Sequence, residues 1–230
     1  LDRRPGVLVQ RDDGVGVAAP LWLGGWRDFL GAPTNVMDAW NEIDIRCRIQ
    51  TMTSLPVEFA KDTTAACVAE LVAGQGRRLR NYLYLFIGTF IGGGLVIDGH
   101  LYPGSTGNAG AVGSLPLRSE EGKEPPQLLH KASGFVLEQI FKQYGHAPAA
   151  AHDERAMSKP MEKQTTAWLK EACPALALTI TSATALLDLD AVVVDGSMHR
   201  SLIDRIVGET AGVLDSYSWE GLTRPHLLAG

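Results

Sequence analysis

A run of four glycines in seven residues, Gly88–Gly94, is the feature that most restricts how this chain folds. It lies between two segments whose composition is typical of strands, Tyr82–Ile87 and Leu95–Ile97. A backbone without Cβ atoms can turn sharply and approach a ligand, and its N–H groups suit a phosphate. A Walker A loop is excluded because Gly94 and Leu95 stand where it needs Lys and Ser or Thr. The run therefore predicts either a phosphate-facing loop or a plain glycine-rich hairpin.

Strand and helix patterns alternate along the second half of the chain. The spacing of apolar residues predicts helices over Gln127–Tyr144 and Arg200–Leu214, and an apolar run predicts a buried strand at Ala191–Val194. Asp98-Gly99 is a strong signal for a hairpin turn, and Pro174 is expected to break or kink the helical pattern around it. With 45% of its 230 residues hydrophobic, the chain has enough apolar material for one large domain or two lobes. The alternation indicates an α/β fold.

Charge and cysteine content argue against several classes of protein. The net charge of −5 speaks against a nucleic-acid surface within these residues, because such a surface needs clustered Lys and Arg. Cys47, Cys67 and Cys173 show no paired spacing, so we expect buried thiols in a reducing cytosol. The histidines lack metal-ligand spacing, and no metal site is predicted by motif. No apolar stretch is long enough to span a membrane and no export signal opens the sequence, so we expect a cytoplasmic protein without a membrane partner.

Asp62 lies between an apolar strand pattern and a helix predicted over Thr63–Val72. An Asp in this place is most often the N-cap of the helix, because its carboxylate accepts from the first free N–H groups. The alternative is a general base at the mouth of a cleft, since strand ends of open α/β sheets place reactive groups there. Both interpretations stay open on chemistry alone.

Three segments together resemble the ROK (repressor, ORF, kinase) family. Gly88–Leu101 and its continuation Gly104–Gly113 are similar to the family's glycine signature. Pro56–Glu70 is similar to its catalytic segment, and Val192–Gly196 to its second nucleotide-side strand. The resemblance implies the two-lobed hexokinase–actin type of α/β fold, which is ribonuclease H-like. It implies an N-terminal lobe over residues 1–62 and a C-terminal lobe over residues 63–230.

The resemblance also implies roles for individual residues. Asp62 would be the base that takes a proton from the sugar hydroxyl, with ATP and Mg²⁺ as cofactors. The residues facing the nucleotide phosphates would be Gly88, Thr89, Gly92, Gly93 and Gly196. The residues contacting the sugar would be Lys61, Asp62, Asn108, Ser114 and Glu138. For Glu138 the alternative is an ordinary glutamate on a helix surface.

The sequence departs from the family pattern at positions that matter for binding. Lys61 replaces an Asn before the catalytic Asp, Phe90 replaces a glycine, and Asp195 replaces a glycine on the adenine side. Ala111 and Ser114 stand in place of the sugar-contacting Glu and His. The Cys-rich zinc loop is replaced by a charged stretch over residues 118–126, so no zinc is expected. Losing one charged hydrogen-bond partner of a sugar hydroxyl costs about 1.5–3 kcal/mol.

The departures favour a sugar-responsive transcriptional regulator over an ATP-dependent sugar kinase, and a carbohydrate-binding module without a DNA-binding role is a third hypothesis. A regulator would bind DNA through a winged helix preceding residue 1, outside these residues. The family resemblance further implies a homodimer. Reading the residues encoded before Leu1 would separate the hypotheses, since a helix-turn-helix pattern supports the regulator and a strand ending Asp-x-Gly-Gly-Thr supports the kinase.

Overall fold

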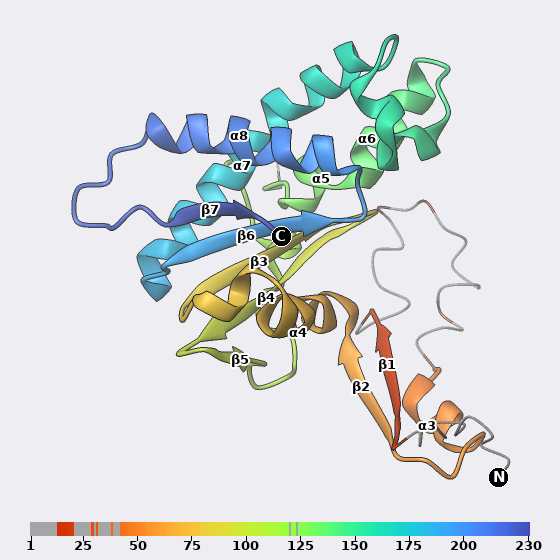
Figure 1. The fold of residues 1–230 in the computed structure, drawn as a ribbon. Coiled ribbons are helices and arrows are strands. Elements are labelled where there is room, and N and C mark those ends of the chain that lie inside the picture. The colour runs from red at the N-terminus through yellow and green to blue at the C-terminus, as the bar shows by residue number, and fades with distance from the viewer. Residues whose placement is uncertain are drawn as a thin grey trace, which may run out of the picture. The chain divides into compact units, whose positions relative to one another are not determined.

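The computed structural model describes residues 13–20, 29, 31, 38, 42–119, 121–122 and 124–230 of the chain (Figure 1). The chain divides into two compact units, Leu1–Asp62 and Thr63–Gly230. The second unit holds most of the described residues and the glycine run.

In the first unit, strands β1 (Val15–Ala19) and β2 (Val57–Lys61) pair in parallel, with Val15 opposite Val57 and Ala19 opposite Lys61. The short helix α3 (Ile45–Gln50) begins after Asp44, whose carboxylate accepts from the N–H of Cys47 as an N-cap. β2 is the strand expected from the apolar pattern before Asp62. Because the strands are parallel, Lys61 and Ala19 lie at the same edge of this two-stranded sheet.

The second unit is built on a five-stranded sheet in the order β5-β4-β3-β6-β7 (Figure 1). Strands β3 (Tyr82–Ile87), β6 (Ala191–Gly196) and β7 (His226–Ala229) are parallel, while β4 (Ile91–Ile97) and β5 (His100–Tyr102) continue the sheet antiparallel. β3 and β6 are almost continuously apolar because both of their faces are covered. Asp98 and Gly99 form the predicted hairpin turn, with the positive φ angles of 51° and 75° that such a turn requires.

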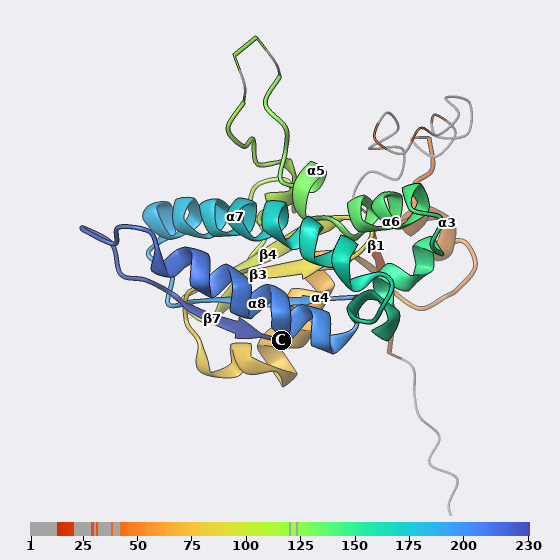
Figure 2. The same cartoon turned by 90° about the horizontal axis from the view of Figure 1, so that it is seen from above.

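Helices cover both faces of this sheet (Figures 1 and 2). Helix α4 (Asp62–Ala73) packs on one face. Helices α7 (Glu162–Leu187) and α8 (Arg200–Asp215) lie against each other, and α8 also packs on β6 and β7. Between these helices the chain forms α5 (Leu129–Ala132), α6 (Gly134–Gln143) and short 3₁₀ turns at Gln75–Arg78, Val112–Ser114, Pro148–His152 and Glu154–Met157.

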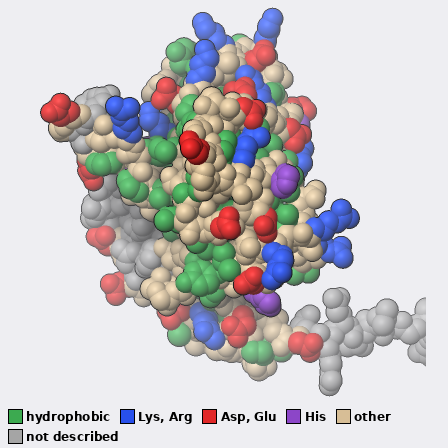
Figure 3. Space-filling model, turned by 90° about the vertical axis from the view of Figure 1, so that its left-hand side faces the viewer, with side chains coloured by type: hydrophobic (Ala, Val, Ile, Leu, Met, Phe, Trp, Pro, Cys, Tyr) green, Lys and Arg blue, Asp and Glu red, His purple; other side chains and the backbone are tan. Residues whose placement is uncertain are grey.

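Charged side chains of both signs share the surface, as the net charge of −5 suggests. On the face shown in Figure 3, Lys and Arg side chains stand beside Asp and Glu side chains. Within the described part of the chain, no helix combines the length and the apolar character needed to cross a membrane.

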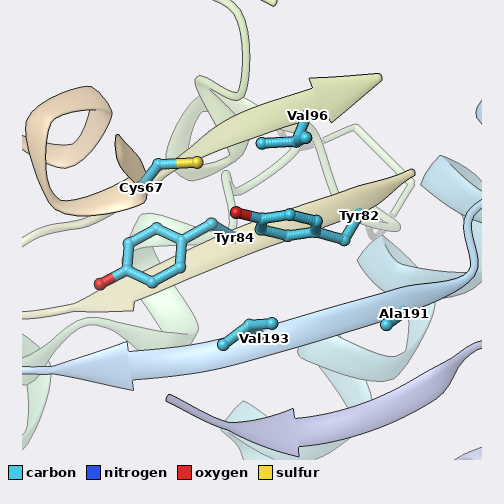
Figure 4. Close-up of a cluster of buried hydrophobic side chains, with 6 residues drawn as sticks. All are labelled: Cys67, Tyr82, Tyr84, Val96, Ala191 and Val193. Carbon is cyan, nitrogen blue, oxygen red and sulfur yellow. The ribbon is translucent and has the colours of Figure 1, made fainter. Parts of the chain in front are cut away.

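The core on the α4 face of the sheet is a cluster in which one cysteine of α4 meets alternate residues of three strands (Figure 4). Its members are Cys67, Tyr82, Tyr84, Val96, Ala191 and Val193. The side chains that alternate with these along β3 and β6, among them Leu85 and Val194, are also buried. Because successive side chains of a strand point to opposite faces of the sheet, these apolar strands contribute buried side chains to both faces.

Three expectations for secondary structure are corrected. Strand β4 begins at Ile91 rather than at Leu95, so most of the glycine run is strand and not loop. The helix predicted over residues 127–144 is interrupted at Ser133, whose ψ of 153° is extended. Pro174 does not break α7, and of the two expected effects only the kink stays a prediction. The hydrogen bond that Pro174 lacks would have ended on the carbonyl of Lys170, and both residues are exposed where water can replace it.

Candidate functional site

The carboxyl edge of the parallel strands in the second unit is the candidate site. Ile87 at the end of β3 is opposite Gly196 at the end of β6, and Val194 is opposite Ala229 in β7. The turn that begins at Gly88 and the segment that begins at Ser197 therefore leave the sheet side by side. Open α/β sheets bind ligands at this edge.

The hairpin turn at this edge is anchored to helix α6. Gly88 N–H donates to the carbonyl of Phe90 at 2.8 Å. The N–H groups of Gly134 and Phe135, the first residues of α6, donate to the carbonyls of Gly88 at 2.8 Å and Thr89 at 3.0 Å. These bonds explain the interruption at Ser133, because α6 must start again where its first N–H groups meet the turn. The positive end of the helix is thus occupied by the protein's own carbonyl groups.

Asp195 places a carboxylate beside the same edge. Its Oδ2 accepts from the hydroxyl of Tyr84 at 2.8 Å, and its Oδ1 accepts from the N–H of Gly196 at 2.8 Å. Burial raises the pKa of Tyr84 above its usual range, and the hydrogen bond to Asp195 raises that pKa further, so the phenol stays a donor.

The carboxyl edge with Asp195 beside it fits a nucleoside triphosphate poorly. Of the backbone donors predicted to face phosphate, Gly88 N–H is bonded to Phe90 and Gly196 N–H to Asp195. The carboxylate of Asp195 would also repel a polyphosphate at short range. Among the described residues, no group of three or more His, Cys, Asp or Glu side chains is placed to hold a metal ion.

Gly92 and Gly93 lie inside strand β4, where their missing side chains make room for neighbouring backbone and side chains. A Cβ on Gly92 would lie 2.9 Å from Cγ2 of Thr63 in α4. A Cβ on Gly93 would collide with the carbonyl of Tyr84 and lie 3.1 Å from the carbonyl of Gly110. Thr63 also donates its hydroxyl to the carbonyl of Gly93 at 3.2 Å. Close packing accounts for these two glycines, and their role toward phosphate stays a prediction.

Glu138 belongs to a chain of three polar side chains at the site. Its Oε1 lies 2.6 Å from Nε2 of His152, and Nδ1 of the same imidazole lies 3.3 Å from Oγ of Ser197. Glu138 comes from α6, His152 from the 3₁₀ turn Pro148–His152, and Ser197 follows β6. Three segments far apart in the sequence therefore converge beside the hairpin turn.

Asn108 and Ser114 lie in the segment between β5 and α5. The segment folds back on itself through the N–H of Ala109, which donates to the carbonyl of Pro103 at 3.0 Å. Gly110, with a φ of 76°, lies against the backbone of Gly93, where a Cβ would come within 2.8 Å. Ser114 ends the 3₁₀ turn Val112–Ser114 and is exposed. Sugar binding by Asn108 and Ser114 stays a prediction.

Lys61 and Asp62 end the first unit. Lys61 is the last residue of β2, and Asp62 is exposed and forms the first residue of α4. Asp62 therefore follows a parallel strand directly, in the place where such sheets carry reactive groups. Its roles as base and as sugar contact stay predictions, as does the sugar contact of Lys61.

The structure brings Gly88, Thr89 and Gly196 together at one edge and adds Glu138 through His152 and Ser197. Sequence reasoning missed His152 and Ser197 altogether. His152 stood in an Ala- and Pro-rich connection without a metal-ligand spacing. Ser197 directly follows Val192–Gly196, the segment that resembles the family's second nucleotide-side strand. A hydroxyl directly after this strand and its Asp-Gly turn was the sequence signal that could have pointed to Ser197.

Solved structures with the same fold include ROK-family sugar kinases and a ROK-family transcriptional regulator. The ROK hexokinase from Thermus thermophilus superposes with a TM-score of 0.68 over 95% of this chain and 73% of that chain, at 21% identity. The fold is therefore the hexokinase–actin type of α/β fold. The family model of the ROK family matches residues 10–226. The chain belongs to the ROK family.

Relatives in this family include both enzymes and repressors. A glucokinase from Halalkalibacterium halodurans is 29% identical over 109 residues, which are 47% of this chain and 32% of that protein. A xylose repressor from Bacillus subtilis is 29% identical over 104 residues, which are 45% of this chain and 26% of the repressor. The matched part thus spans about a third or less of these relatives.

Proposed function

We propose that this chain is the effector-binding part of a sugar-responsive transcriptional regulator of the ROK family. Its ligand is a sugar or sugar derivative, and its DNA contact lies in a segment outside these residues. A regulator needs only a ligand that prefers one conformational state, because differential binding shifts the equilibrium between states. The family resemblance supports a homodimer in the cytoplasm.

The observation that carries this proposal is that backbone N–H groups at the carboxyl edge of the sheet donate their hydrogen bonds within the protein. Gly88 N–H and Gly196 N–H are both bonded within the protein, the second to the carboxylate of Asp195. Phosphoryl transfer depends on donors and cations that stabilise charge on the transferred group. An edge with bonded amides and an added carboxylate serves that chemistry poorly, whereas sugar binding does not need it.

The alternative is an ATP-dependent sugar kinase with Asp62 as its base and ATP and Mg²⁺ as cofactors. It is supported by the exposed position of Asp62 directly after β2 and by the similarity to a glucokinase. The similarity to a xylose repressor is of the same extent. Sequence identity to the two relatives therefore does not favour the kinase or the regulator. The hydrogen bonding and charge at the carboxyl edge of the sheet favour the regulator.

The experiment is a phosphotransfer assay with full-length protein, ATP, Mg²⁺ and a panel of hexoses, pentoses and their amino derivatives. The wild-type chain and Asp62→Asn are compared, since this substitution removes the base and keeps the size of the side chain. We expect no turnover that depends on Asp62. Turnover that disappears in Asp62→Asn would overturn the regulator in favour of the kinase.

Ligand binding is measured on the same panel by isothermal titration calorimetry. We expect one sugar class to bind without ATP and to change the affinity of the full-length protein for DNA from its own promoter region. Asp215→Asn is a matched control for the change from carboxylate to amide, since that carboxylate pairs with Arg224 outside the predicted sugar residues. Absence of any sugar binding by the wild-type protein would contradict both hypotheses.

A further inference from the structure

Ser197, His152 and Glu138 are arranged as a nucleophile, a base and the group that orients the base. A carboxylate only accepts hydrogen bonds, so the contact of 2.6 Å with Glu138 places the proton of neutral His152 on Nε2. Nδ1 is then the acceptor for the hydroxyl of Ser197 at 3.3 Å. This geometry is the general signature of an activated serine, in which the distance between nucleophile and base is often longer without substrate.

The backbone presents Ser197 in the manner of a reactive hydroxyl. The residue follows the end of β6 on the short connection to α8, so it lies on a strand-to-helix turn at the carboxyl edge of the sheet. Gly196 before it has no room for a side chain, because a Cβ would collide with the carbonyl of Ile87. A Cβ on Gly88 would lie 3.3 Å from Oγ of Ser197, so a glycine at this position keeps the hydroxyl uncovered.

Exposure separates the three groups in a way that suits catalysis. Ser197 is exposed, while the side chains of His152 and Glu138 are only 25% and 19% exposed. The hydrogen bond from His152 Nε2 to the carboxylate of Glu138 is therefore partly withdrawn from water, where a bond to a charged acceptor holds an imidazole firmly. The nucleophile remains accessible to a substrate.

A polar pocket of about 290 Å³ is lined by chain neighbours of His152 and Ser197, namely Asp153, Glu154, Arg155 and His199. Asp153 follows His152 in the chain, and His199 is two residues after Ser197. Three of the four lining side chains are acidic or basic, and Arg155 is paired with Asp153 at 2.6 Å. A pocket of this size and polarity suits a small hydroxylated group and not a long acyl chain.

We propose that Ser197, His152 and Glu138 form a catalytic triad that hydrolyses small acyl esters of polar alcohols. Oγ of Ser197 attacks the acyl carbon, a C–O bond forms, and His152 Nδ1 takes the hydroxyl proton. His152 returns that proton to the alcohol oxygen as the ester C–O bond breaks. Water then loses a proton to His152 and attacks the acyl carbon. The bond between that carbon and Oγ of Ser197 breaks, His152 returns the proton to Oγ, and the carboxylic acid is released.

The first test is covalent labelling of the full-length wild-type protein with a fluorophosphonate probe, followed by peptide mass spectrometry. The probe reacts with activated serines, so we expect label on Ser197 and its loss after heat denaturation. Labelling of another serine, or no labelling, overturns the proposal. This test uses no variant and therefore does not depend on the folding of a mutant.

The second test is hydrolysis of p-nitrophenyl acetate and p-nitrophenyl laurate, with heat-denatured protein as background. We expect acetate to be the better substrate, and Ser197→Ala and His152→Ala to lower its rate by about 100-fold or more, the usual contribution of a base and its nucleophile. Glu138→Gln should lower the rate by about 100-fold to 10⁴-fold, because an amide no longer fixes the tautomer and charge of His152. Ser216→Ala is the matched control, since Ser216 ends α8 and bonds only locally to the carbonyl of Val213. Equal rates in wild type, Ser197→Ala and Ser216→Ala overturn the triad.

Discussion

The hydroxyl of Tyr84 in β3 donates to Oδ2 of Asp195 in the neighbouring strand β6 at 2.8 Å. This bond joins two adjacent parallel strands by their side chains, next to the edge where both strands end. It holds the carboxylate that also accepts from Gly196 N–H. The pair therefore fixes both the packing of the core and the charge beside the candidate site.

Tyr84→Phe should destabilise the protein by about 2 kcal/mol, because a buried hydrogen bond to a charged acceptor contributes about 1.5–3 kcal/mol. Urea unfolding followed by circular dichroism measures the free energy of unfolding. Tyr144→Phe is the control, since Tyr144 is 64% exposed and should change stability by less than about 0.5 kcal/mol. Equal losses in the two variants would show that the Tyr84 hydroxyl contributes nothing specific.

Gly94→Ala should destabilise the protein by about 1–3 kcal/mol, the usual cost of overpacking a core. A Cβ at this position would lie 2.5 Å from the Cβ of Cys67 on α4, so the helix would have to move away from the sheet. The midpoint of thermal unfolding reports the change.

Gly208→Ala is the matched control for that substitution. Gly208 is an exposed position in α8 with no atom within 4 Å of an added Cβ. Alanine should stabilise the protein there by about 0.5–1 kcal/mol, because it lowers the entropy lost in forming a helix. Opposite signs at the two glycines are expected, and a gain in stability at Gly94 would refute close packing of α4 on β4.

One thiol should react with Ellman's reagent in the folded protein and three after unfolding. Cys47 is exposed, whereas Cys67 and Cys173 are buried, and burial raises the pKa of Cys173 to about 11. The hydrogen bond from the Cys47 thiol to the carboxylate of Asp44 raises the pKa of Cys47, so its thiolate fraction and its rate of reaction are reduced. Asp44→Asn should therefore react faster at pH 8 than the wild type, and a slower reaction would contradict this cause.

The carboxyl group of Asp153 should stay ionised well below its ordinary pKa. Hydrogen bonds from Arg155 lower that pKa from 3.8 to about 2, and NMR titration of the side-chain carboxyl carbon measures it. Because the folded pKa is depressed, the stabilising effect is present above pH 3.8 and is lost as the pH falls from 3.8 toward 2. Arg155→Met should raise the pKa of Asp153 toward 3.8, and Arg224→Met, which removes a partner of Asp215, should leave it unchanged.

The strands and the fold class could be predicted from composition because buried parallel strands require long apolar runs such as Tyr82–Ile87 and Ala191–Val194. The Asp98-Gly99 turn could also be predicted, since few residue pairs tolerate two positive φ angles. The family resemblance, based on the glycine spacing, is confirmed by the match over residues 10–226.

The candidate site could be predicted only in part. Gly92 looked like loop because glycine is a poor strand former, and the requirement for it comes from Thr63 on a helix about thirty residues earlier in the sequence, a tertiary contact that no local pattern records. His152 and Ser197 are 45 residues apart in the chain. Their convergence depends on how the 3₁₀ turn Pro148–His152 lies against the end of β6, so it could not be deduced from spacing.

The bonds from Gly134 and Phe135 to the carbonyls of Gly88 and Thr89 have a mechanical consequence. If the tip of the hairpin shifts, either the N–H groups of Gly134 and Phe135 lose their hydrogen-bond acceptors or the start of α6 moves with the tip. Movement of α6 costs less free energy than leaving two amide groups without acceptors. A molecule that pushes on the tip would therefore displace a rigid rod of ten residues ending at Gln143. A small local displacement at the hairpin would therefore be transmitted to the far end of α6, almost three helical turns away.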